Sequence, residues 1–185
     1  MRASLMTVAL SAAALFLVAC GPGLKAPKTS DGSKIGLYIV YDRNLPADGE
    51  AEILAQRTQM SEYLEADLNK LLPKYGYEVF PIAAADQFNP GPNKFLMNVK
   101  VVDYDPGKAG ARVARALMGG FVGRSIAKAG GSKISVEYTL SGEQGKVASA
   151  DYNLAAKDWK WQNLIRDLNL AVLKSTSKSL QALYK

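Results

Sequence analysis

Two aspartates that stand two residues apart are the first candidates for chemistry in this chain. Asp103 and Asp105 flank Tyr104 and precede Pro106-Gly107. Residues two apart in an extended strand point to the same side, so the two carboxylates could converge as an acid pair. The same pattern is also typical of a strand that ends in a tight turn. The sequence favours the turn. A calcium-binding loop of the EF-hand type is also excluded, because its other ligand positions are absent.

The only cysteine, Cys20, closes an apolar N-terminal run. Arg2 is followed by an uncharged stretch from Ala3 to Ala19, which is typical of a secretory signal peptide. Leu17-Val18-Ala19-Cys20 resembles the lipobox of bacterial lipoproteins. The resemblance implies cleavage before Cys20, a diacylglyceryl thioether on its sulfur and acylation of its amino group.

Two alternatives to a lipidated cysteine are weaker. A transmembrane helix needs about 20 apolar residues, and Ser4, Thr7 and Ser11 dilute this stretch. An ordinary signal peptide cut near Ala19 would leave a lone cysteine unexplained in an oxidising compartment. In lipoproteins of Gram-negative cells an Asp after the cysteine commonly signals inner-membrane retention, and this chain has Gly21 there. For a host with two membranes, the resemblance therefore implies an outer-membrane anchor that faces the periplasm.

Composition excludes several functional classes. The chain has no histidine, which excludes Ser-His-Asp and Cys-His nucleophiles and His-ligated metals. A lipidated Cys20 removes thiolate chemistry and disulfides as well. Without Arg2, 22 basic residues face 17 acidic ones, but no Lys/Arg cluster alternates with stacking aromatics as in nucleic-acid-binding proteins. We expect no enzyme, cofactor, metal or nucleic acid. The basic excess favours anionic lipid, lipopolysaccharide or cell wall, or else a solvated surface without a dedicated partner.

Three segments divide the chain. Residues 1–19 are predicted to be the signal peptide, and residues 20–34, rich in Gly, Pro, Lys and Ser, a lipidated flexible tether. Residues 35–185 are long enough for a single periplasmic domain with its own core. We expect this domain to fold without the lipid.

Hydrophobic periodicity predicts the elements that this domain contains. Helical spacing predicts one helix from Ala51 to the Pro73 region and another from an Asp158 cap to Leu183. Short apolar or alternating runs predict strands over 35–41, 77–81, 95–102, 133–141 and 146–154, the last two joined as a hairpin through Gly142 to Gly145. The order β-α-β-β-(Gly-rich insertion)-β-β-α predicts an α+β fold. Its mostly antiparallel sheet of about five strands is backed by the two long helices.

The insertion over residues 107–131 is the least ordinary segment. Gly119 and Gly123 form a G-x-x-x-G spacing that lets backbones approach closely. Three interpretations remain open: a connecting loop with a short helix, a packing or self-association surface, and an interfacial membrane contact. The residues that would make the association surface are Arg112, Arg115, Gly119, Gly120, Phe121, Gly123 and Arg124.

A third of the chain carries a family resemblance. FLMNVKVVDYDPG, then GGFVG, KISVEYTL and GKVAS, over roughly residues 94–150, resembles a group of proteobacterial envelope lipoproteins known only as a domain of unknown function. The resemblance implies an envelope lipoprotein and brings no catalytic residues. More distantly, the β-α-β-β layout with a lipid tether is similar to lipoproteins that activate cell-wall synthases.

These features predict a lipid-anchored, non-enzymatic interaction or assembly module in the periplasm. Its partner would be an envelope protein or a second copy of the chain. The alternative is a lipoprotein that binds an anionic envelope ligand, either cell wall or lipopolysaccharide, or that activates a cell-wall enzyme.

Overall fold

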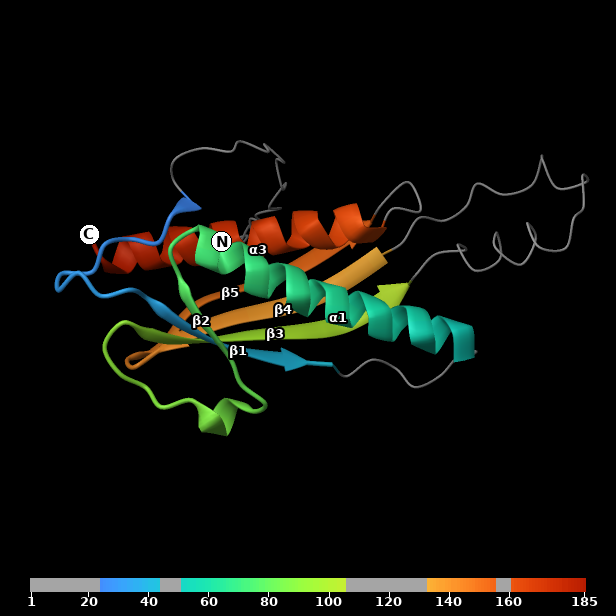
Figure 1. Ribbon diagram of the computed structural model, residues 1–185, viewed down its shortest axis with the longest axis horizontal. Helices are drawn as coiled ribbons and strands as arrows, with labels where there is room; N and C mark the ends of the chain where they lie inside the picture. Colours follow the sequence, from blue (N-terminus) through green and yellow to red (C-terminus); the bar gives the residue numbers. More distant parts are fainter. Residues whose placement is uncertain (1–23, 44–50, 106–132, 156–160) are drawn as a thin grey trace, which may run out of the picture.

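A mixed sheet with two long helices on one face forms the domain (Figure 1). The computed structural model describes residues 24–43, 51–105, 133–155 and 161–185. The elements are β1 (Gly36–Asp42), α1 (Ala51–Lys74), β2 (Glu78–Pro81), the 3-10 turn η2 (Ala85–Gln87), β3 (Lys94–Asp105), β4 (Lys133–Gly142), β5 (Gly145–Ala155) and α3 (Trp161–Leu183).

The strand order in the sheet is β2-β1-β3-β4-β5. β1 runs parallel to β2 and β3, and α1 supplies the crossover that a parallel β1–β2 connection requires. The β3–β4 and β4–β5 pairs are antiparallel and have the longest registers. The predicted α+β class and its mostly antiparallel sheet with two helices are therefore confirmed, and the sheet is mixed because β1 runs parallel to both of its neighbours.

The predicted hairpin is present, with a shorter connection than expected. Gly142 pairs with Gly145, so only Glu143 and Gln144 lie between β4 and β5. Gly145 has a φ of +106°, which a residue with a side chain rarely adopts. The second predicted helix is α3, described over Trp161–Leu183, and its expected cap, Asp158, lies outside the described residues.

The core lies between the helices and one face of the sheet. Alternate residues of β1, β3 and β4 are buried there, as the period of two predicts. The helices contribute residues at spacings of three and four. The completely or almost completely buried set includes Leu37, Ile39, Met97, Val99, Val136, Tyr138, Leu140, Leu64, Leu68, Leu72, Ile165, Leu168 and Val172.

The opposite face of the sheet is covered by no helix within the described ranges. At one end of this face, Tyr38 stacks on Phe80 with ring centroids 4.8 Å apart, and Phe88 from the segment after η2 lies 5.3 Å from Tyr38. Phe80 remains exposed at this end, and Val102 is exposed near the other end of β3. None of the described helices has an apolar stretch long enough to cross a membrane.

A buried amide joins the two helices. The Asn169 side chain of α3 is almost fully buried, and its Nδ2 donates to the Leu64 carbonyl oxygen at 3.2 Å and to Asp67 Oδ2 at 2.8 Å. A buried amide without partners is unfavourable, so these two hydrogen bonds fix how α3 sits against α1.

Asn169→Ala is expected to destabilise the domain by about 2 kcal/mol, because it removes a charge-assisted hydrogen bond to Asp67 and a second hydrogen bond to the Leu64 carbonyl oxygen. The measurement is the free energy of unfolding in urea. Asn163→Ala is the matched control, since Asn163 is exposed on the same helix, and its change should stay within about 0.5 kcal/mol. Equal stabilities of the two variants would contradict the role of this amide.

Candidate functional site: a lysine-lined groove

The association residues expected from the sequence lie outside the described residues. This holds for Cys20 and for Arg112, Arg115, Gly119, Gly120, Phe121, Gly123 and Arg124. Lipidation of Cys20 and association through the Gly-rich insertion over 107–131 therefore stay predictions.

The two aspartates belong to the end of β3, and the tight turn expected at Pro106-Gly107 lies outside the described residues. The pairing with β4 shifts register between Val101 and Asp103, so the buried series Met97, Val99, Val101 continues at Tyr104. This bulge leaves Asp103 exposed. β3 ends at Asp105. Within the described ranges, no three His, Cys, Asp or Glu side chains form a group that could hold a metal ion.

The N-terminal segment before β1 lies against the domain. The Ala26 N–H donates to the Tyr75 carbonyl oxygen at 2.8 Å, and the Ser177 hydroxyl of α3 donates to the Lys25 carbonyl oxygen at 3.2 Å. Ala26 packs against the core, and Thr29 is buried. These contacts correct the prediction of a flexible tether over 20–34: from Lys25 onward the segment belongs to the folded domain, because the carboxyl ends of α1 and α3 offer it partners.

The end of α1 shapes the surface that receives this segment. Pro73 stands in the last turn, and the chain then reverses through Gly76, whose φ is +95°. A Cβ at Gly76 would lie 3.6 Å from the Ala26 Cβ, so the reversal brings α1 close to the docked segment. Tyr77 follows and is buried, and this burial raises the pKa of Tyr77 to about 12.

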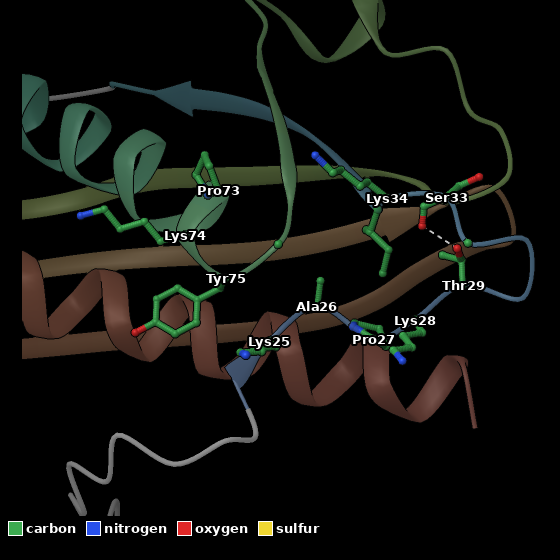
Figure 2. Close-up of a pocket in the computed structure, with 13 residues that line it drawn as sticks. Lys25, Ala26, Pro27, Lys28, Thr29, Ser33, Lys34, Pro73, Lys74 and Tyr75 are labelled. Carbon is green, nitrogen blue, oxygen red and sulfur yellow. Dashed lines mark hydrogen bonds between the residues drawn. The ribbon is translucent and has the colours of Figure 1, made fainter.

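Between the docked segment and the end of α1 lies a groove of about 610 Å³. Figure 2 shows the side chains that line it. Four of them are exposed lysines, Lys25, Lys28, Lys34 and Lys74, and its apolar wall includes Ala26, Pro27, Ile35, Pro73 and Tyr75. Among the described residues, no aspartate or glutamate lines the groove. An apolar wall with a cationic rim suits an anionic group that carries an apolar part.

The local charge balance of the groove is basic. In the described part of the chain, none of the four lysines forms an ion pair. The nearby carboxylate of Asp31 accepts a hydrogen bond from the Ser33 N–H at 2.9 Å. This bond lowers the pKa of Asp31, so it stays ionised beside the groove without lining it.

The sequence alone does not predict the groove, because a Gly-, Pro- and Lys-rich segment is typical of a tether. The lysines of this segment indicate only a general basic excess. One local signal was present: Thr29, Asp31 and Gly32 form a turn sequence, and in the structure the Thr29 hydroxyl donates to the Ser33 carbonyl oxygen (Figure 2). The contacts of Lys25 and Ala26 with Tyr75 and Ser177 had no signal of their own, since they depend on where α1 and α3 end.

No family model and no curated protein matches this chain. Among solved structures it is similar to a Xanthomonas campestris protein of the family DUF330, with 14% identity, a TM-score of 0.49, and coverage of 88% of this chain and 91% of the other. It is also similar to a minor lipoprotein from Acinetobacter baumannii, with 13% identity, a TM-score of 0.36, and coverage of 78% and 93%. Because these TM-scores are below 0.5, the similarities define neither a family nor a function.

Proposed function

We propose that this chain is a lipid-anchored envelope protein whose periplasmic domain acts as a non-catalytic interaction module at the outer membrane. The lipobox at residues 17–20 supports the anchor. The observation that carries the proposal is the docking of the segment that begins at Lys25, five residues after the lipidated cysteine. A short link of this kind holds one end of the domain at the membrane and leaves the opposite end available to a partner.

The first candidate partner is an envelope protein or a second copy of the chain. The close-approach spacing of Gly119 and Gly123 supports it. The second candidate is an anionic envelope ligand, and the four lysines of the groove favour it. Activation of a cell-wall enzyme is the other form of this second candidate.

The experiment is chemical crosslinking in envelopes, detergent solubilisation and recovery of the full chain with its partners. Gly119→Leu and Gly123→Leu are expected to remove a stoichiometric partner or reduce oligomer size, because a leucine side chain would separate two closely packed backbones. The solubilised variants should still give the circular dichroism spectrum of a folded domain. Lys146→Ala, an exposed change on β5, is the control.

Unchanged recovery in both leucine variants would show that the insertion over 107–131 is only a connection. Unfolding of both variants would assign the glycines to internal packing and remove the support for association. Retention of the chain by purified cell wall or lipopolysaccharide alone would favour the second candidate.

A further inference from the structure

The lysine side chains determine the electrostatic potential in the groove. A helix carries partial negative charge at its C-terminal carbonyls, which would oppose anion binding near the end of α1. Two of those carbonyls already accept hydrogen bonds, Leu72 O from Tyr75 N at 3.0 Å and Pro73 O from Gly76 N at 3.1 Å, and the Tyr75 carbonyl just after the helix accepts from Ala26 N at 2.8 Å. The described lining then carries four exposed ammonium groups and no carboxylate, and Asp31 lies beside it.

The arrangement of the lysines favours several anions over one. Figure 2 shows Lys34 and Lys74 on one side of the groove and Lys25 and Lys28 on the other, with their ammonium groups pointing in different directions around the rim. A site for a single small phosphate would bring its donors together on one point. A spread rim fits a surface that carries many phosphate groups, and the apolar wall between the lysines fits the upper part of a lipid.

The covalent anchor brings this rim to a membrane. The five residue steps from Cys20 to Lys25 span at most about 18 Å, because an extended chain covers about 3.3–3.6 Å per residue. The Lys25 carbonyl is itself held by Ser177. With lipid on Cys20, the groove therefore stays beside the headgroups, where lysines interact with anionic lipid over roughly one Debye length.

We propose that the groove formed by Lys25, Lys28, Lys34 and Lys74 binds the phosphate groups of anionic phospholipids in the leaflet that anchors Cys20, and so holds the domain in one orientation on the membrane. This inference rests on the proposed lipid anchor. It assigns the groove a ligand class, the phosphate diester of a lipid headgroup. The opposite end of the sheet, where β3 ends and β4 begins, then faces away from the membrane.

The test uses the lipidated full chain in vesicles. Ser30→Cys supplies one free thiol for a spin label, because the lipid occupies the sulfur of the only native cysteine. Ser30 is exposed beside the groove and does not line it. Asn153→Cys places a second label at the opposite end of the sheet, where Asn153 pairs with Ser135. The readout is the collision rate of each label with a water-soluble nickel complex.

The label at position 30 is expected to be shielded in vesicles that contain phosphatidylglycerol and accessible in vesicles of phosphatidylcholine alone. The label at position 153 should be accessible in both. Raising salt from roughly 0.1 M to 1 M should expose position 30, because the Debye length falls from about 10 Å to about 3 Å.

The combined change Lys28→Gln, Lys34→Gln and Lys74→Gln should expose position 30 in the phosphatidylglycerol vesicles. Each lysine near an anionic surface favours binding about fivefold, so the three together should shift the orientation equilibrium about a hundredfold. Lys25 is left unchanged, because its carbonyl oxygen accepts the Ser177 hydrogen bond that holds the docked segment. The matched control changes three exposed basic residues away from the groove, Lys133, Arg166 and Lys174, to glutamine and should leave position 30 shielded.

Equal accessibility of position 30 in both kinds of vesicle, or equal effects of the two triple variants, would overturn the groove proposal while the lipid anchor stands. Shielding that inorganic phosphate removes at constant ionic strength would assign the groove to free phosphate and overturn the lipid source. A chain whose Cys20 carries no lipid by mass spectrometry would overturn the proposed function as well.

Discussion

Cys20→Ala is expected to abolish lipid attachment completely. Alanine has no sulfur to accept the diacylglyceryl group, and without that modification cleavage at the lipobox should not occur. Each buried CH2 of an acyl chain contributes about 0.8 kcal/mol, so two or three acyl chains hold the natural protein on a membrane. The variant carries no acyl chain. Labelled palmitate should enter the natural chain and be absent from the variant, which should accumulate as a larger precursor.

Lys146→Ala is the control for this experiment, because it changes an exposed residue of the hairpin far from the N-terminus in sequence. It should incorporate as much label as the natural chain. Label in the Cys20→Ala chain would end the lipoprotein interpretation, since the chain has no other cysteine.

Removing the docked N-terminal segment should give the largest loss of stability among the changes considered. A chain that begins at Ser33 loses the Ala26–Tyr75 and Ser177–Lys25 hydrogen bonds and the buried surface of Ala26 and Thr29. We expect a loss of about 2–3 kcal/mol in the free energy of unfolding. The transition should remain cooperative, because the core from Ile35 onward is retained.

The matched control is a soluble chain that begins at Lys25, compared with one that begins at Gly21. Both keep the docked segment, so their thermal transitions should coincide. Coincidence of all three transitions would show that the segment adds nothing to stability. A disordered spectrum for the chain that begins at Ser33 would contradict a self-sufficient core after Ile35.

Periodicity predicted the elements well because β1, β3, β4 and both long helices each have one buried face. The odd-numbered residues Met97, Val99 and Val101 of β3 are all buried in the core, and the leucines of α1 recur at four-residue spacings. These patterns depend on local sequence alone. The parallel placement of β1 between β2 and β3 is also compatible with this order of elements, but the sequence of β1 does not indicate which strands pair with it.

Two features depended on contacts between distant residues. The bulge between Val101 and Asp103 moves Tyr104 to the core face, and it follows from the register with β4 rather than from any glycine in β3. The groove depends on where Pro73 and Gly76 end α1, since the carbonyl that binds Ala26 belongs to the residue between them. Composition predicted a tether there because Gly, Pro and Lys are common in flexible linkers.

The most direct measurement for the central claim is the mass of the N-terminal peptide of the protein purified from membranes. A lipid-anchored envelope protein predicts a peptide that begins at Cys20 and carries the diacylglyceryl thioether and an acyl group on its amino nitrogen. The groove proposal then requires this lipid to lie five residues before the docked Lys25. An N-terminal peptide with an unmodified Cys20, or a chain that keeps residues 1–19, would contradict the account.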